Sequence, residues 1–167
     1  MDNVSLYFAG PLGFSEVGRS FMYKEMVPIV LDLGFEVIDP WKLTPDEKIA
    51  PITEMPYGAE RKAAWEKVNP VIGENNAKGI EKATGMIAIL DGTDVDSGTA
   101  SEIGYGSALG KRILGYKGDF RLTSDNEGSL VNLQVEYFIK KNGGKIITQI
   151  ADFKPSLKSL FDVALKV

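Results

Sequence analysis

The chain of 167 residues contains no cysteine and no histidine. The missing thiols exclude disulfides and thiol nucleophiles, and the missing imidazoles exclude Ser/His triads and nearly all zinc sites. Any acid–base chemistry must therefore be carried by carboxylates.

Long apolar runs and excess positive charge are also missing. No run approaches the roughly 18 residues that span a bilayer, and the N-terminus has no basic region followed by an apolar stretch, which predicts a cytoplasmic protein with no membrane partner. The net charge of -4 leaves no basic surface for a nucleic-acid polymer. Small neutral substrates fit this composition better. The length and the 44% hydrophobic content predict a single domain over residues 1–167.

Short β-rich runs alternate with stretches of helical period. The runs predict five strands, at Val4 to Ala9, Phe35 to Ile38, Met86 to Leu90, Ile113 to Tyr116 and Ile146 to Ile150. Five helices are expected. They are Glu16 to Leu33, kinked or split at Pro28; a helix capped by Asn69 with Pro70 at its first position, ending at Lys82; Gly98 to Leu109; Leu130 to Lys141; and Pro155 to Leu165.

This alternation predicts an α/β fold with a doubly wound, flavodoxin-like, five-stranded parallel sheet and helices on both faces. Such sheets bind ligands beyond the carboxyl ends of their strands, so chemistry is expected just after each strand. The proline-rich segment from Trp41 to Tyr57 is the longest irregular stretch, and we interpret it as a lid over the site.

The segment from Leu90 to Gly106 is the most informative one, because it leaves a buried strand, forms a loop with three aspartates and enters a helix. Glu102 is expected near the first turn, where the helix dipole and free N–H groups favour the ionised carboxylate. Nucleophilic attack on an anomeric carbon requires that form. The alternative is an acidic residue that only stabilises the helix. A calcium loop does not fit, since Thr99 and Tyr105 stand where it needs glycine and glutamate.

The first strand ends in Leu6-Tyr7-Phe8-Ala9-Gly10-Pro11. Gly10 would let the backbone approach a ligand closely, and Tyr7 could donate its hydroxyl to a carboxylate or simply belong to the core. Neither a dinucleotide fingerprint nor a P-loop is present. Phe14 and Trp41 are candidate stacking surfaces for an aromatic ligand, with core and lid packing as the alternative.

Four segments in order resemble the nucleoside 2-deoxyribosyltransferase family, and the resemblance spans nearly the whole chain except the lid and the last helix. They are Leu6 to Pro11, Asp91 to Lys111, Gly118-Asp119-Phe120-Arg121, and Ser124 to Gln134 with Val131-Asn132-Leu133.

The resemblance implies roles for individual residues. Glu102 would be the nucleophile, Tyr7 would orient it, and Asp96 would hold sugar hydroxyls. Asn132 would reach the sugar's 5′ hydroxyl in a neighbouring subunit, which implies a homo-oligomer with shared sites. Relatives that hydrolyse nucleoside 5′-monophosphates tend to have serine at the position of Asp96, so the free nucleoside is the better substrate hypothesis.

One position departs from the family pattern. Asn76 occupies the place of the usual acid for the departing base, and a neutral amide binds the base without supplying a titratable proton. The proton would then come from water, from Asp39 or Asp94, or from a base that is already protonated. Asn76 could also be only a polar residue of the helix surface.

The resemblance therefore implies an enzyme of nucleotide salvage that exchanges purine or pyrimidine bases on 2′-deoxyribonucleosides through a covalent glycosyl-Glu102 intermediate, with no metal or organic cofactor. The alternatives are an N-glycosidase acting on deoxynucleosides or their 5′-monophosphates, and a non-catalytic nucleoside sensor on the same scaffold.

Overall fold

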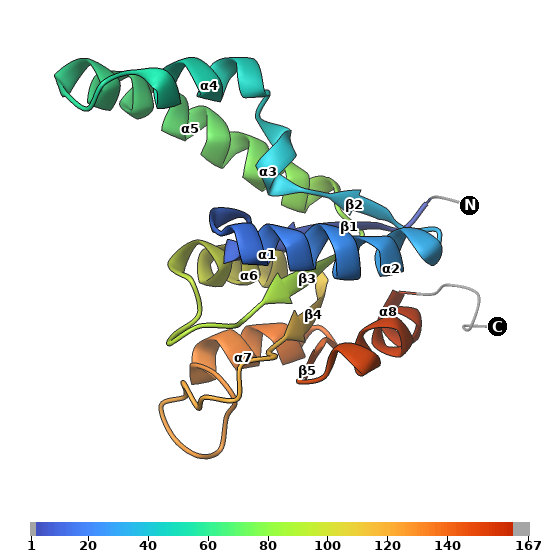
Figure 1. Cartoon of the computed structure of the whole chain (residues 1–167). Coiled ribbons are helices and arrows are strands. Elements are labelled where there is room, and N and C mark those ends of the chain that lie inside the picture. Colours follow the sequence, from blue (N-terminus) through green and yellow to red (C-terminus); the bar gives the residue numbers. More distant parts are fainter. Residues whose placement is uncertain (1–2, 162–167) are drawn as a thin grey trace.

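The computed structural model describes residues 3–161 and contains a five-stranded parallel sheet in the order β2-β1-β3-β4-β5 (Figure 1). The strands are β1 (Ser5–Ala9), β2 (Glu36–Ile38), β3 (Gly85–Ile89), β4 (Arg112–Tyr116) and β5 (Lys145–Ile147). This is the doubly wound order, and it confirms the predicted fold class. The last strand is shorter than predicted, because Ile150 begins a 3-10 turn, η3 (Ile150–Asp152).

The sheet buries a separate hydrophobic cluster on each face. Leu6 and Phe8 of β1 pack with residues of α1 (Glu16–Phe21), η2 (Met22–Met26), α2 (Val27–Asp32) and α8 (Phe153–Phe161). Tyr7 and Ala9 point to the other face, toward α5 (Ala59–Lys82), α6 (Ser97–Ala108) and α7 (Leu133–Lys141). The period of two along β1 thus assigns Tyr7 to the same face as the helix that carries Glu102.

The first helical stretch is divided, as the proline predicts. A π-helical turn, η2, separates α1 from α2, and Pro28 lies in the first turn of α2. Proline has no N–H to donate, so the wider turn before it accommodates the missing hydrogen bond.

Two predictions about the segment before β3 were wrong. The helix predicted to start at Asn69 begins at Ala59, and Pro70 lies inside it. Pro70 is exposed, so water can pair with the carbonyl that its ring leaves free. The stretch from Trp41 to Tyr57 is largely helical, with α3 (Pro40–Leu43) and α4 (Asp46–Glu54). α4 and the first half of α5 form an arm, residues 46–70, that projects from the body of the molecule (Figure 1).

The last two helices lie close to their predicted positions. α7 begins at Leu133 rather than Leu130, because Asn132 caps it. α8 begins two residues before the predicted Pro155, and the predicted end at Leu165 lies outside the described residues. Within residues 3–161, no helix combines the length and apolarity needed to cross a bilayer.

Candidate active site

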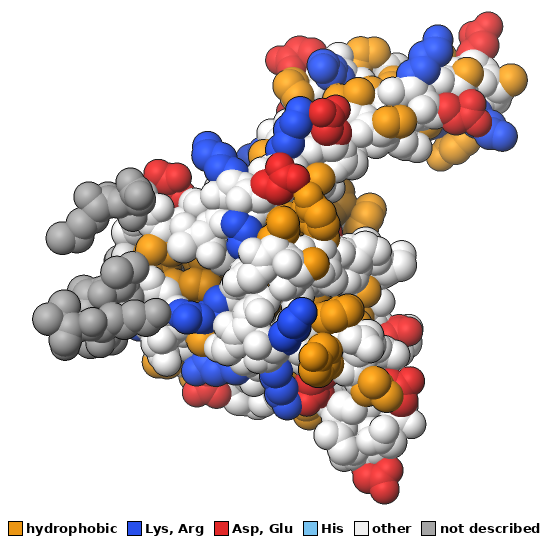
Figure 2. All heavy atoms as spheres, turned by 180° about the vertical axis from the view of Figure 1, so that it is seen from behind, with side chains coloured by type: hydrophobic (Ala, Val, Ile, Leu, Met, Phe, Trp, Pro, Cys, Tyr) orange, Lys and Arg blue, Asp and Glu red, His pale blue; other side chains and the backbone are white. Residues whose placement is uncertain are grey.

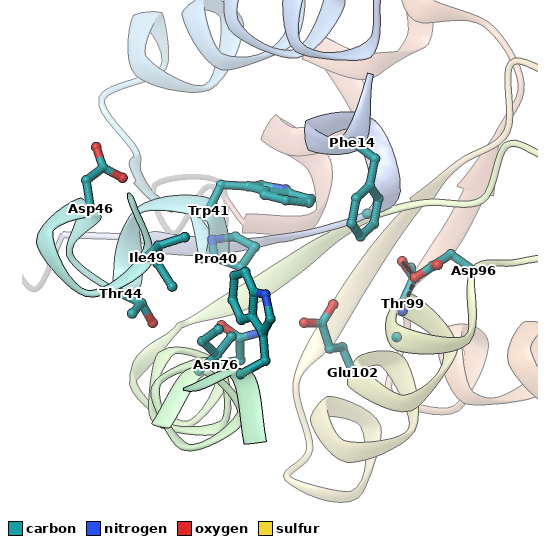
Figure 3. Close-up of a pocket in the computed structure, with 14 residues that line it drawn as sticks. Phe14, Pro40, Trp41, Thr44, Asp46, Ile49, Asn76, Asp96, Thr99 and Glu102 are labelled. Carbon is teal, nitrogen blue, oxygen red and sulfur yellow. Dashed lines mark hydrogen bonds between the residues drawn. The ribbon is translucent and has the colours of Figure 1, made fainter. Parts of the chain in front are cut away.

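A cavity of about 560 Å³ opens beyond the carboxyl ends of β1, β2 and β3, between α6 and the arm. Its described lining comes from the turns after these strands and from helices α3 to α6 (Figure 3). The lining residues are Gly10, Phe14, Pro40, Trp41, Thr44, Asp46, Ile49, Trp65, Ile72, Asn76, Asp96, Gly98, Thr99 and Glu102. The location is the one expected for a ligand site in this fold.

Glu102 and Tyr7 form the central polar contact of the site. The Tyr7 hydroxyl donates a hydrogen bond to Glu102 Oε1 over 2.6 Å. Tyr7 is fully buried in β1. Burial is the main cause that raises the pKa of its hydroxyl above the usual range, and the negative charge of Glu102 is the second. The hydroxyl is therefore a permanent donor, and it fixes one carboxylate oxygen while Glu102 faces the cavity (Figure 3).

The electrostatic argument made for Glu102 from the sequence was wrong. Glu102 is the sixth residue of a helix that begins at Ser97, so it lies beyond the four free N–H groups of the helix start. Burial raises its pKa, the Tyr7 hydrogen bond lowers it, and the charge of Asp96 raises it, with a net upward displacement. The ionised form of Glu102 is thus supported by Tyr7 rather than by the helix dipole.

Asp96 has a structural role as well as a place in the cavity. It is the N-cap of α6, and its Oδ2 accepts hydrogen bonds from Thr99 N over 2.9 Å and from Thr99 Oγ1 over 3.1 Å. Its other oxygen, Oδ1, has no hydrogen bond to another described residue. Since Asp96 lines the cavity, one carboxylate oxygen is held by the helix and the other is left for a ligand (Figure 3).

Asn76 lies on α5, across the cavity from Glu102 (Figure 3). Its Oδ1 is buried without a hydrogen-bond partner among the described residues. A buried amide oxygen in that state is costly, so a ligand donor at this point would be favoured. This argues against the reading of Asn76 as a plain surface residue.

Aromatic side chains form one wall of the cavity. The Phe14 and Trp41 rings meet edge to face, with their centroids 4.6 Å apart. Gly13 is needed for this arrangement, because a Cβ there would lie 2.0 Å from Trp41 Cε2. Trp65 of α5 joins the same lining.

Gly10 brings the backbone of the first turn close to β3. A Cβ at this position would lie 2.8 Å from the Cβ of Ile89. The glycine thus permits close packing at the floor of the cavity, which it also lines.

Several lining residues were missed in the sequence. They come from the end of α3, from α4 and from α5, and are Thr44, Asp46, Ile49, Trp65 and Ile72. Trp65, Ile72 and Asn76 recur at spacings of seven and four, which is the signal of one helix face. Because this helix was predicted to begin at Asn69, Trp65 was left out of that pattern.

Four predicted residues do not line the cavity: Tyr7, which contacts Glu102 from β1, and Asn132, Asp39 and Asp94. Asn132 caps α7, accepting from Gln134 N over 3.0 Å. Asp39 caps α3 and accepts from the Tyr23 hydroxyl over 2.7 Å. Asp94 accepts from Val95 N over 2.7 Å. The two aspartates considered as proton sources are therefore engaged in local structure, and neither lines the cavity.

The sequence model of the family described as nucleoside 2-deoxyribosyltransferase matches residues 6–134. The chain belongs to this family. The match includes all of β1 but its first residue, the lining of the cavity and the N-cap of α7, so family membership and the geometry of the site concern the same residues.

Solved structures with the same fold are similar to the chain at low sequence identity. A 2-deoxyribosyltransferase from Bacillus psychrosaccharolyticus has 23% identity and a TM-score of 0.60, with 90% of each chain covered. A 2-deoxyribosyltransferase from Leishmania mexicana has 21% identity and a TM-score of 0.61, over 93% of this chain and 95% of that one. A CMP N-glycosidase from Clostridium botulinum has 15% identity and a TM-score of 0.55, over 93% and 98%. No functionally curated protein matches the chain. The family match thus assigns the chain to the nucleoside 2-deoxyribosyltransferase family, and the solved structures show that these proteins share its fold.

Proposed function

We propose that the protein is a nucleoside 2′-deoxyribosyltransferase in which Glu102 is the nucleophile. The observation that carries the proposal is the 2.6 Å hydrogen bond from the Tyr7 hydroxyl to Glu102 Oε1 at the wall of a cavity of about 560 Å³. A carboxylate held at one oxygen keeps the other free to attack an anomeric carbon.

The reaction is a double displacement with retention. Glu102 attacks C1′ of the nucleoside, the C1′–N bond breaks, and the base leaves with the bonding electron pair. A second base then attacks C1′ of the glycosyl ester from the same face and releases the carboxylate. Water takes the place of this base when no acceptor is bound.

Sugar and base are bound at opposite ends of the cavity. Asp96 accepts hydrogen bonds from sugar hydroxyls through Oδ1, and Asn76 contacts the base together with the Phe14 and Trp41 rings. No lysine or arginine occurs in the described lining, which favours the free nucleoside over its 5′-monophosphate. A phosphate beside Asp96 would meet a like charge.

A second subunit completes each site. Asn132 lies outside the cavity of its own chain, at the end of the loop of residues 118–132. Exposed hydrophobic side chains surround this region on α6, α7 and the loop, and Figure 2 shows hydrophobic side chains gathered along that side of the molecule. They are Tyr105, Leu109, Phe120, Leu122, Leu133 and Tyr137. A patch of this kind favours self-association, and the partner's Asn132 would then approach the sugar.

Base exchange tests the proposal. The protein is incubated with 2′-deoxyinosine and adenine, and both bases and both nucleosides are followed by chromatography. Formation of 2′-deoxyadenosine, abolished in Glu102→Ala, is expected. Unchanged 2′-deoxyinosine would refute the proposed base exchange. Hypoxanthine and free 2-deoxyribose as the only products would instead establish an N-glycosidase.

A further inference from the structure

The ionisable side chains of the cavity all carry the same sign of charge. Among its fourteen described lining residues, Asp46, Asp96 and Glu102 are acidic and none is lysine or arginine. Such a lining raises the local concentration of cations and repels anions. A bound group that carries positive charge is therefore favoured on electrostatic grounds.

The aromatic lining favours the same kind of ligand. Trp41 and Trp65 are the only two tryptophans of the chain, and both line this cavity together with Phe14. Indole is the best cation–π partner among side chains, and the attraction is strongest where the cation is desolvated. A flat cation is attracted to both the rings and the carboxylates.

The cavity offers poor means of protonating a leaving base. Asn76, across from Glu102, is a neutral amide. Glu102 itself is needed as the nucleophile, and Asp96 is held by Thr99 at the start of α6. Asp46 is exposed at the start of α4, and Figure 3 shows it at the end of the site remote from Glu102.

We infer that the base subsite is selective for 2-deoxyribosides whose heteroaromatic base is positively charged before the C1′–N bond breaks. The inference rests on the proposed function and names its substrate class. A Glu102 oxygen forms the bond to C1′, and the electron pair of the C1′–N bond goes to the base nitrogen. The cationic base leaves as a neutral molecule, the carboxylate becomes a neutral ester, and no proton is transferred.

The test compares two nucleosides. One is the 2′-deoxyriboside of nicotinamide, whose pyridinium nitrogen is permanently cationic; the other is 2′-deoxyinosine, which is neutral. For each, kcat/KM of base release is divided by the rate of uncatalysed hydrolysis under the same conditions, since the cationic compound is intrinsically more labile. An acid catalyst contributes about 10²- to 10⁴-fold to cleavage of a neutral nucleoside, so an enzyme that had one would accelerate 2′-deoxyinosine more.

The expected result is at least equal acceleration of the cationic nucleoside. Its kcat/KM should also be independent of pH above the acidic limb set by Glu102, whereas that of 2′-deoxyinosine should keep falling as the pH rises. Asn76→Asp, which adds a titratable carboxyl, should increase turnover of 2′-deoxyinosine at least tenfold. Trp65→Leu should weaken the binding of the cationic nucleoside more than the binding of the neutral one.

Two results would have different meanings. Acceleration of 2′-deoxyinosine that exceeds that of the cationic nucleoside by about 100-fold would overturn the inference and leave the transferase intact. Release of neither base would overturn the proposed function itself.

Discussion

Replacement of Tyr7 by phenylalanine removes one hydroxyl from the site and leaves the ring in place. Tyr7 is fully buried, and its hydroxyl donates to Glu102 over 2.6 Å. A hydrogen bond to a charged group contributes about 1.5–3 kcal/mol. If the transition state needs Glu102 in this orientation, the loss corresponds to a decrease in kcat of about 10- to 150-fold.

The same substitution has a predicted effect on pH dependence. The Tyr7 hydrogen bond lowers the pKa of Glu102, opposing burial. Its removal should raise that pKa, so the acidic limb of kcat/KM for base release should move to higher pH. Single-turnover cleavage of the 2′-deoxyriboside of nicotinamide, measured from pH 5 to 8, reports both the rate and the limb, because its base needs no proton to leave.

Tyr105→Phe is the matched control. Tyr105 lies on α6 with Glu102 and, like Tyr7, donates to a carboxylate, Glu81 Oε1 over 2.5 Å, but it does not line the cavity. Phenylalanine keeps the exposed ring that belongs to the proposed subunit contact. Tyr105→Phe should leave kcat and the acidic limb unchanged. The role assigned to Tyr7 would be refuted if Tyr7→Phe and Tyr105→Phe changed kcat equally. It would also be refuted if the acidic limb of kcat/KM stayed at its original pH in Tyr7→Phe.

Three further perturbations follow from the site. Asp96→Asn keeps an oxygen that can cap α6, so it should preserve thermal stability while decreasing kcat/KM about tenfold or more. It should also move the acidic limb of kcat/KM to lower pH, since the charge of Asp96 raises the pKa of Glu102. An acidic limb at its original pH would contradict this role of Asp96. Glu102→Gln should melt at a higher temperature than the original chain, by a margin that grows from pH 4 to 8. A carboxyl whose pKa is raised on folding makes the fold less stable as the pH rises through the interval between its unfolded and folded pKa, and glutamine has no such dependence. A margin in calorimetry that is constant with pH would speak against a buried, ionised Glu102. Asn132→Ala and Glu102→Gln should each be inactive alone and regain activity when mixed under conditions that allow subunits to exchange, whereas failure of the mixture would exclude a site completed by the partner's Asn132.

The fold could be predicted because its signals are local and repeated. The apolar runs of β1, β3 and β4 are buried, and glycines or caps end the helices between them, so a parallel sheet covered by helices on both faces could be predicted from alternation alone. The arm could not be predicted in the same way. Pro45, Pro51 and Pro56 indicate irregular backbone, yet Pro45 precedes α4 and Pro51 lies within it, where packing against α5 outweighs the local cost.

The site was predicted unevenly for a related reason. Gly10, Phe14, Asp96 and Glu102 follow strands, where the sheet architecture concentrates ligands, and the structure gathers them around one cavity. Trp65 lies in a helix whose start was predicted ten residues too late, and it does not follow a strand. The rule that ligands bind beyond strand ends therefore could not identify it. The helix-dipole argument for Glu102 failed because the free N–H groups belong to the first turn alone, and Glu102 is the sixth residue of α6.

The most direct test of the central claim is to look for the glycosyl-enzyme. The protein is mixed with 2′-deoxyinosine without an acceptor base, quenched with acid within its first turnovers, and analysed by intact mass spectrometry and peptide mapping. An increase by the mass of one 2-deoxyribosyl group, located on Glu102 and absent from Glu102→Gln, is the predicted result. Base release with no adduct at any time, or an adduct on another residue, would contradict it.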